Sequence, residues 1–484
     1  MEKIDRTIKE GPYQDSWESL CKYNPPKWYN DAKFGIFIHW GVYSVPAFGN
    51  EWYPRNMYKT GTKEYEHHIK TYGPHKDFGY KDFIPDFNGK KFNAEEWAGL
   101  FKEAGAKYIM PVAEHHDGFA LYKTGFSKWN ACEMGPKEDI IGELKKAAEK
   151  QGIVFSVSFH RAEHCWFFNG GRDYESDIND PKYEDFYEKQ QDGGDDTHNI
   201  YSVPPNKEHC EDWLVRICEL VDNYQPQIVW FDWWIHNVGW KPYLKKFAAY
   251  YYNSAKKWGK EVAINHKYNA YAYGSAVFDV ERGQLAEIRP RLWQTDTANA
   301  KNSWGYTENN IFKDPVTIVG DLIDIVSKNG VLLLNIGPRA DGSIPDEDRN
   351  ILLSIGSWLK KNGEGIYETT FWQWFGEGPT KIMEGAFKDV DRSSFTSEDF
   401  RFTYKNGVLY AFVMKYPQNG KILIPSLKKT EGIIRGGGDF DIKSVRILGY
   451  PNKINFSRET SGLSIIVDGE ISTEYPVGFA IQLD

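Results

Sequence analysis

Eight short apolar runs, separated by longer and mostly amphipathic stretches, constrain the fold of this chain more than any other feature. Such alternation is typical of parallel strands joined by crossover helices, and eight strands suit a closed (β/α)8 barrel. The runs lie at residues 34–38, 108–112, 153–157, 228–231, 262–264, 276–278, 292–293 and 331–336. We therefore expect a (β/α)8-like barrel.

Helix signals fill several of the gaps between these runs. Asn93 is placed to cap a helix that ends at Gly105. A second amphipathic stretch, residues 211–224, leads directly into the fourth run, as a βα unit requires.

The carboxyl-terminal part of the chain follows a different pattern. From about Phe375, short alternating strands and turns appear, and glycines 436–438 predict a hairpin turn. The chain has 484 residues, more than a single hydrophobic core usually serves. We expect a catalytic barrel over residues 1–370 and an antiparallel β-sandwich over residues 371–484.

Charge and cysteine content exclude several classes of protein. The net charge of −9 disfavours nucleic acids and anionic membranes as partners, because both need clustered Lys and Arg. Five scattered cysteines without CxxC spacing indicate a reduced compartment and no zinc ribbon. The amino terminus lacks an apolar signal region, and no run approaches 18 apolar residues. We expect a cytoplasmic protein.

Polar and titratable side chains follow the apolar runs. Because the carboxyl ends of barrel strands meet at one face, these side chains are expected to converge on one site. A barrel without a catalytic function does not need so many titratable groups there, so the pattern predicts an enzyme. The residues are His39, Glu114, His115, His116, His160, Asp232, Asn265, His266, Glu281, Gln294, Asp296 and Asn335.

Asp232 ends the fourth run within the sequence IVWFDWW, residues 228–234. An aspartate in this place often only caps the next turn. Aromatic faces, however, stack on the apolar face of a sugar ring, and a carboxylate beside them can attack an oxocarbenium-like centre. Together with the other strand ends, Asp232 favours sugar chemistry.

A retaining glycosidase needs a second carboxyl group about 5–5.5 Å from the first. We predict Asp232 as the nucleophile and Glu281, which ends the sixth run, as the acid/base. The alternative for Glu281 is a structural ion pair with Arg282 or with another basic group. Asp279 shares a face with Glu281 if the strand continues, so one could be catalytic and the other supporting. Three other glutamates remain competitors: Glu51, Glu114 and Glu163.

The histidines at these strand ends invite a metal-site interpretation, because imidazole and carboxylate are common ligands. Neighbouring strand residues point to opposite faces, so His115 and His116 converge on one ion only if they lie in a loop. We therefore expect no metal and interpret these side chains as partners of sugar hydroxyls. Trp304, in the sequence WGY, could add another aromatic wall.

Six sequence blocks occur together in the order found in one enzyme family. They are FGIFIHWGVYSVPA (34–47), EWY (51–53), FNAEEWA (92–98), EHHDGFALY (114–122), WFD (230–232) and NGVLLLNIGPRADGSIP (329–345). They resemble glycoside hydrolase family 29, the retaining α-L-fucosidases, over about residues 20–370, and the combination is highly specific.

The resemblance implies a barrel with a carboxyl-terminal β-sandwich, no cofactor, and a double displacement through a covalent fucosyl-enzyme. The implied substrate is a fucosylated oligosaccharide or glycoside. Asp232 matches the nucleophile of the family. Six further positions match residues that line the fucose pocket in such enzymes: His39, Glu51, Trp52, His115, His116 and Trp230.

The chain departs from the family pattern at several strand ends. His160 stands in a run that usually holds a tyrosine, and we expect it to take over a hydroxyl contact. The usual Asn-Asp-Arg is here Asn265-His266-Lys267, so the basic contact passes to Lys267. Gln294 replaces a glutamate found in some members and removes one rival. The acid/base position varies in this family, and Glu281 is assigned by its place after AVFDV.

Two other classes stay open at this point. One is a related exo-glycosidase for a fucose-like sugar such as L-galactose, and the other is a non-catalytic fucose-binding protein. The presence of both Asp232 and Glu281 favours an enzyme over a binding protein. Transfer of fucose to acceptors other than water is also expected. A homo-oligomer is compatible with the sequence, and loops such as residues 166–206 are expected to set the linkage preference, the aglycone and the oligomeric state.

Overall fold

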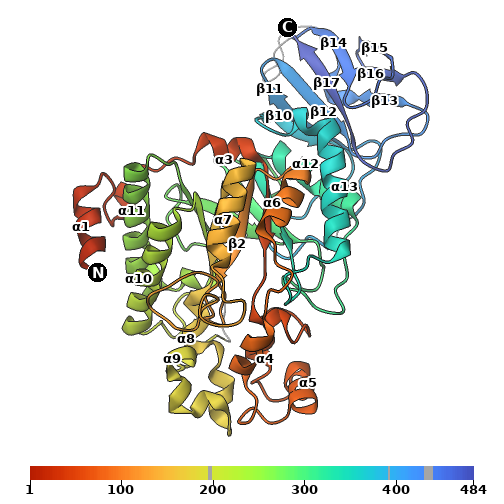
Figure 1. The fold of residues 1–484 in the computed structure, drawn as a ribbon. Coiled ribbons are helices and arrows are strands. Elements are labelled where there is room, and N and C mark those ends of the chain that lie inside the picture. Colours follow the sequence, from red (N-terminus) through yellow and green to blue (C-terminus); the bar gives the residue numbers. More distant parts are fainter. Residues whose placement is uncertain (195–198, 391–392, 430–439) are drawn as a thin grey trace.

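The computed structural model describes residues 1–194, 199–390, 393–429 and 440–484. The hairpin turn predicted at glycines 436–438 lies outside the described residues. The amino-terminal part forms a closed parallel barrel and the carboxyl-terminal part forms two antiparallel sheets (Figure 1). The predicted fold class is therefore confirmed.

All eight apolar runs form strands of the barrel. The sheet order is β1-β9-β8-β7-β6-β5-β4-β2-β3, every pairing is parallel, and pairing of β1 with β2 closes the barrel. The third run is split into two short strands, which both pair with β2. The strands are β1 (Phe34–Ile38), β2 (Tyr108–Glu114), β3 (Val154–Phe155), β4 (Val157–Phe159), β5 (Ile228–Phe231), β6 (Ala263–His266), β7 (Val277–Glu281), β8 (Trp293–Ala298) and β9 (Gly330–Ile336).

Alternate residues of each strand fill the barrel or face the helices outside. Phe37 on β1 points inward and packs with Tyr108, Trp230 and Leu333, whereas its neighbours belong to the outer core. Gly35 also points inward, where a Cβ atom would meet the Tyr108 ring at 2.4 Å. Glycine at this position therefore makes room for the tyrosine that closes the barrel interior.

Helices cover most of the outer surface of the barrel (Figure 1). The predicted cap at Asn93 is confirmed, since its side chain accepts hydrogen bonds from the amides of Glu95 and Glu96. The helix before β5 begins at Lys207, four residues earlier than expected, because Asn206 caps it. The main helices are α1 (Glu2–Glu10), α3 (Lys27–Ala32), α6 (Ala94–Glu103), α7 (Ile140–Gln151), α10 (Lys207–Tyr224), α11 (Lys241–Trp258), α12 (Pro315–Ser327) and α13 (Asp346–Asn362).

Shorter helices lie in the loops that follow β1 and β4, and Figure 1 shows them at the end of the barrel opposite the β-domain. This end carries the carboxyl termini of the strands. The helices in these loops are α4 (Tyr53–Asn56), α5 (Lys63–Tyr72), α8 (His164–Phe167) and α9 (Glu184–Tyr187).

The carboxyl-terminal part is built from a five-stranded and a three-stranded antiparallel sheet, ordered β10-β11-β12-β17-β14 and β13-β16-β15. Their facing sides enclose one hydrophobic core. The strands are β10 (Thr370–Glu377), β11 (Phe400–Lys405), β12 (Val408–Val413), β13 (Lys421–Ile424), β14 (Ile442–Ile447), β15 (Ile454–Glu459), β16 (Gly462–Val467) and β17 (Val477–Leu483).

The two parts share a buried interface formed by α12 and α13 against the five-stranded sheet. The indole of Trp358 on α13 donates to the carbonyl of Pro476 at 2.8 Å. Asp324 on α12 binds Lys328 at 2.6 Å and the guanidinium of Arg401 from β11. This buried ionic triad ties the β-domain to the barrel.

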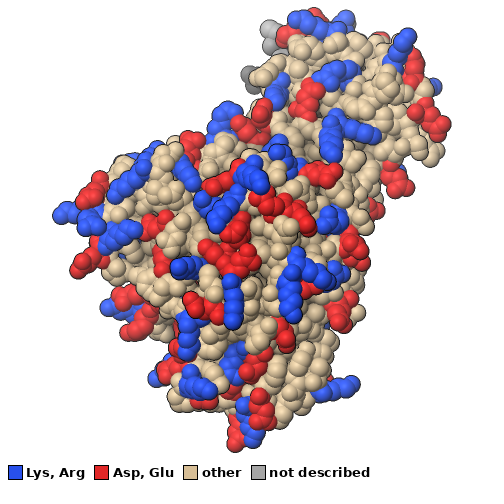
Figure 2. Space-filling view, in the orientation of Figure 1, with Lys and Arg blue, Asp and Glu red and all other residues tan. Residues whose placement is uncertain are grey.

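Basic and acidic side chains are interspersed over the face of the molecule shown in Figure 2. Within the described ranges, no helix combines the length and apolar character needed to cross a membrane.

Candidate active site

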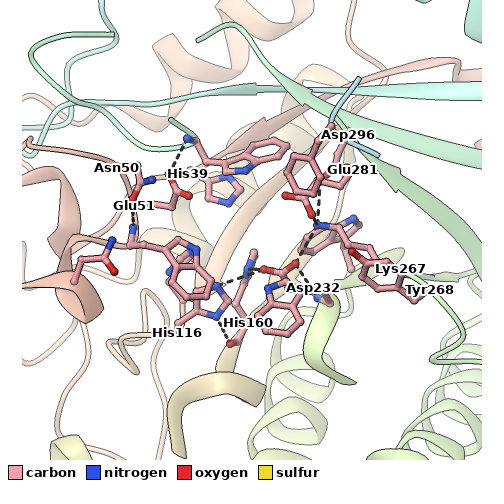
Figure 3. Close-up of a pocket in the computed structure, with 17 residues that line it drawn as sticks. His39, Asn50, Glu51, His116, His160, Asp232, Lys267, Tyr268, Glu281 and Asp296 are labelled. Atoms are coloured by element: carbon pink, nitrogen blue, oxygen red, sulfur yellow. Dashed lines mark hydrogen bonds and ion pairs between the residues drawn. The ribbon is translucent and has the colours of Figure 1, made fainter. Parts of the chain in front are cut away.

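A cavity of about 430 Å³ opens at the carboxyl ends of the barrel strands (Figure 3). The eleven side chains that the sequence predicts as catalytic or sugar-binding all line it: His39, Glu51, Trp52, His115, His116, His160, Trp230, Asp232, Lys267, Glu281 and Trp304. The chain brings them from positions up to 265 residues apart because successive strands end at this face. Of the twelve strand-end groups expected to converge here, Asp296 also lines the cavity, whereas five do not: Glu114, Asn265, His266, Gln294 and Asn335.

Asp232 follows β5 and receives polar contacts on both oxygens. Oδ1 accepts from the Trp233 amide at 2.8 Å and from Lys267 Nζ at 3.0 Å. Oδ2 lies 3.4 Å from His116 Nε2 and 3.3 Å from His160 Nδ1. Burial would raise the pKa of Asp232, but Lys267 and the two histidines outweigh it and hold the pKa well below its usual range. The carboxylate is ionised at neutral pH.

Lys267 joins the two predicted catalytic carboxyl groups. Its Nζ lies 3.0 Å from Asp232 Oδ1 and 2.6 Å from Glu281 Oε2. The sum of these contacts, 5.6 Å, is the largest separation that the two oxygens can have. Only 12% and 13% of the Asp232 and Glu281 side chains are exposed, so water screens these charges weakly.

Glu281 holds its proton much more strongly than an ordinary glutamate. Burial raises its pKa, and the negative charges of Asp232 and Asp296 add to this effect against the attraction of Lys267, bringing the pKa to about 7. The pKa of Asp232 is thus below its ordinary range and that of Glu281 is above it, and both groups face one cavity. This is the pattern of an acid beside a permanently ionised base or nucleophile.

Two further carboxyl groups, Asp279 and Asp296, lie beside Lys267. Asp296 Oδ2 is 3.9 Å from Lys267 Nζ, and Asp279 accepts a hydrogen bond from Gln294 at 2.7 Å. Burial, together with the charge of Asp279, raises the pKa of Asp296 well above its usual range. Asp279 shares the inward face of β7 with Glu281, as the strand register predicts, but only Glu281 lines the cavity.

His116 acts as a second cation beside Asp232. Its Nδ1 donates to Glu163 Oε2 at 3.0 Å, and its Nε2 faces Asp232. Burial alone would lower the pKa of His116, but Glu163 and Asp232 raise it to about 10. Glu163 therefore orients His116 from behind and does not line the cavity.

The other three histidines of the cavity are neutral. Burial lowers the pKa of His160 to about 4 and the pKa values of His39 and His115 well below the usual value. His39 Nδ1 lies 2.7 Å from the Asn335 side-chain oxygen, and the Asn335 amide nitrogen donates to Trp304 O. Nδ1 of His39 must therefore carry the proton, which leaves Nε2 as an acceptor for a hydroxyl group.

Two groups among the described residues bring three possible metal ligands within 4.8 Å of one another. They are His39 with His115 and His160, and His116 with His160 and Asp232. The alternation expected for strand residues does not apply to His115 and His116, because both lie in the loop beyond Glu114, where β2 ends. Both side chains line the cavity for this reason.

The two remaining candidates for the acid/base role, Glu51 and Glu114, are bound to other groups. Glu51 lines the cavity, but its Oε2 accepts from the Trp304 amide at 2.8 Å and from Ser303 at 3.2 Å. Glu114 is fully buried and binds Arg161 at 2.7 Å, outside the cavity. Glu281 is joined to Asp232 through Lys267 and lines the cavity, whereas Glu163, which is joined to Asp232 through His116, does not line it.

Sequence reasoning missed five residues that line the cavity: Asn50, Asn56, Trp233, Tyr268 and Phe387. Asn50, Trp233 and Tyr268 are neighbours of predicted residues in the sequence, which is a weak signal. Phe387 lies in the connection from β10 to β11 and had no signal. Its amide donates to the Glu281 carbonyl at 2.9 Å, which places it at the cavity.

Comparisons with known proteins agree with this architecture. The family model described as Alpha-L-fucosidase matches residues 1–364, and that of the Alpha-L-fucosidase C-terminal domain matches residues 393–484. The plasma α-L-fucosidase of Homo sapiens is 32% identical over 472 residues, covering 94% of this chain and 88% of that protein. The human tissue α-L-fucosidase is 30% identical, covering 88% of this chain and 83% of that protein.

Among solved structures, the Thermotoga maritima α-fucosidase in complex with fucose superposes with a TM-score of 0.73 at 29% identity. The match covers 97% of this chain and all of that one. The family model spans well over half of the sequence, and the barrel followed by antiparallel sheets fits the fold of the family. The chain therefore belongs to the α-L-fucosidases of glycoside hydrolase family 29.

Proposed function

We propose that the protein is an exo-acting, retaining α-L-fucosidase that releases terminal α-L-fucosyl residues by double displacement. The observation that carries this proposal is the placement of Lys267 between Asp232 and Glu281. It limits the distance between the facing oxygens to 5.6 Å. Retaining glycosidases hold their carboxyl groups about 5–5.5 Å apart, whereas inverting enzymes need about 6.5–9.5 Å to admit a water molecule.

In the first step, the Asp232 carboxylate attacks the anomeric carbon while the bond from that carbon to the leaving oxygen breaks. Glu281 gives its proton to the leaving oxygen and becomes a carboxylate. In the second step, Glu281 takes a proton from water, whose oxygen attacks the anomeric carbon. The bond to Asp232 breaks and fucose leaves with its original configuration.

The charges around Asp232 suit both steps. His116 and Lys267 keep Asp232 ionised before attack and stabilise it again when it leaves. Loss of the Asp232 charge in the covalent intermediate removes one of the groups that raise the pKa of Glu281. Glu281 then becomes more acidic, as a group that must next accept a proton from water requires.

The rest of the cavity supports binding of a small hydroxylated sugar. His39 offers an acceptor through Nε2, and His116 and Lys267 offer donors. The Trp52 and Trp233 rings lie nearly parallel, with centroids 6.4 Å apart. Such faces suit the C5 methyl group of fucose, which lacks the hydroxyl of L-galactose.

The test compares an aryl α-L-fucoside with its α-L-galactoside analogue, using wild type, Asp232→Gly, Glu281→Ala and Glu51→Ala in the presence of azide. Asp232→Gly is expected to lose fucose release and to form the β-L-fucosyl azide by a single inversion. Glu281→Ala is expected to form the α-L-fucosyl azide by two inversions.

An α-azide from Glu51→Ala instead would reassign the acid/base. A faster reaction with the galactoside would change the proposed sugar, and no release from either substrate would support a binding protein. Transfer is tested by adding a sugar acceptor to the wild-type reaction. Absence of any fucosylated acceptor among the products would contradict that part of the proposal.

A further inference from the structure

A second cavity lies on the outer side of β7, next to the catalytic cavity, with a volume of about 650 Å³. It exists because the connections on either side of this strand, residues 267–276 and 282–292, contain turns and no helix, and both are fully described. In a regular barrel a helix would cover this face. Phe278, which points outward from β7, remains 39% exposed instead.

The second cavity is lined mainly by apolar and aromatic side chains: Tyr271, Tyr273, Ala276, Phe278, Leu285 and Leu292. Its charged border groups interact with one another or with a ring. Arg289 binds Glu384 at 2.9 Å, and the Arg291 guanidinium lies 5.4 Å from the centre of the Tyr273 ring. Such a surface gains free energy by taking an apolar group out of water.

The two cavities adjoin at one side of the active site. Three residues line both of them: Lys267, Tyr268 and Glu281. Figure 3 shows these three side chains together, on the side of the pocket opposite Glu51. The segment 384–387 crosses the border, since residues 384–386 line the second cavity and Phe387 lines the first. Hydrogen bonds from the Gly385 and Phe387 amides hold this segment to the barrel at 3.0 and 2.9 Å.

We infer that the second cavity binds the aglycone of the substrate, and that the aglycone it fits is apolar, an aryl group or an alkyl chain. This inference rests on the proposed function, because the leaving oxygen must lie within reach of the acid/base Glu281. Glu281 is the border between the cavities, so an aglycone that leaves the fucose pocket on that side passes Tyr268 and Phe387. Those exposed rings, 39% and 55%, flank its path.

The test measures kcat/KM for alkyl α-L-fucosides from methyl to octyl, all below their micelle concentrations. Aliphatic leaving groups of this series have nearly equal basicity, so the chemical step stays constant and chain length reports binding alone. We expect kcat/KM to rise roughly two- to fourfold per methylene group until the cavity is filled.

Phe278→Ser is expected to reduce the octyl-to-methyl ratio of kcat/KM by about tenfold, since it places a hydroxyl on the apolar face. Phe387→Ala, in a connection outside any strand, is a second variant that leaves β7 intact and is expected to reduce the same ratio. The matched control is Phe456→Ser, on β15 of the β-domain, where the phenylalanine is 38% exposed. This control should retain the wild-type ratio.

An octyl-to-methyl ratio near one in wild type would overturn the inference, as would an unchanged ratio in both variants. A fucosylated oligosaccharide that reacts faster than octyl fucoside at equal concentration would also overturn it, because it would indicate a polar aglycone. Failure of the proposed function is distinguishable, since no fucoside of the series, methyl included, would then be hydrolysed.

Discussion

The charge of Asp232 should control the proton affinity of Glu281, and the isosteric substitution Asp232→Asn isolates this effect. Asparagine keeps the size and burial of the side chain and removes only its charge. The two oxygens that contact Lys267 lie at most 5.6 Å apart, and two unit charges at that separation interact by about 3 kcal/mol at an effective dielectric constant near 20, which corresponds to about two pKa units. The pKa of Glu281, about 7 in the wild type, should therefore fall to about 5. Lys267 acts in the same direction once Asp232 no longer shares it.

The assay is a pH titration of protein labelled with [13Cδ]glutamate, in which the Glu281 resonance is assigned by its absence from Glu281→Gln. Glu51→Gln is the matched control, because Glu51 lines the same cavity but is bound to the Trp304 amide and Ser303. We expect the pKa of Glu281 to stay near 7 in this control. A Glu281 pKa that stays near 7 in Asp232→Asn would refute the coupling on which the acid/base assignment depends.

Three other predictions concern charged groups, two in the catalytic cavity and one at the interface between the barrel and the β-domain. First, kcat/KM for methyl α-L-fucoside should fall with rising pH through an apparent pKa near 7, because Glu281 must be protonated, and Glu281→Gln should remove this limb from the pH–rate profile. Second, Asp296→Asn should move the basic limb of the pH–rate profile to lower pH, because it removes one of the negative charges that raise the pKa of Glu281; an unchanged limb would show that Asp296 carries no charge beside Glu281. Third, Asp324→Asn should lower the free energy of unfolding in urea by about 3–5 kcal/mol, because it leaves Lys328 and Arg401 as buried cations without their anion. Burial opposes ionisation of Asp324, but the two cations outweigh it and lower its pKa. The wild-type advantage should therefore persist at neutral pH and disappear as the pH falls through that lowered pKa, and a constant advantage down to acid pH would contradict the reasoning.

Most of the fold could be predicted because apolar runs and helix caps are local signals. The four residues of β5 and the cap at Asn93 were both expected from their own neighbourhood. The early start of α10 was missed because Asn206 was not considered as a cap. The uncovered face of β7 was also missed, since a short connection shows only that a helix does not fit and not which surface is left open.

Residues of the site were predictable where they follow a strand, because the barrel brings strand ends together. Asp232 and Glu281 belong to this class. The bridging position of Lys267 was not predictable, because it depends on the side-chain conformations of three residues from three strand ends. Phe387 reaches the cavity from the connection between β10 and β11, and no local pattern marks a residue brought there by long-range packing.

Two barrel strands that no helix follows, β6 and β7, carry two of the groups that the proposed chemistry uses. Lys267 directly follows β6 and Glu281 ends β7, and neither strand is followed by a helix. A helix after β7 would cover the face on which the second cavity lies, beside the leaving group. Glu281 therefore lines both cavities, while Asp232, after β5 and before the long helix α11, lines only the catalytic cavity. Fucose and aglycone would then be recognised on opposite sides of one glutamate.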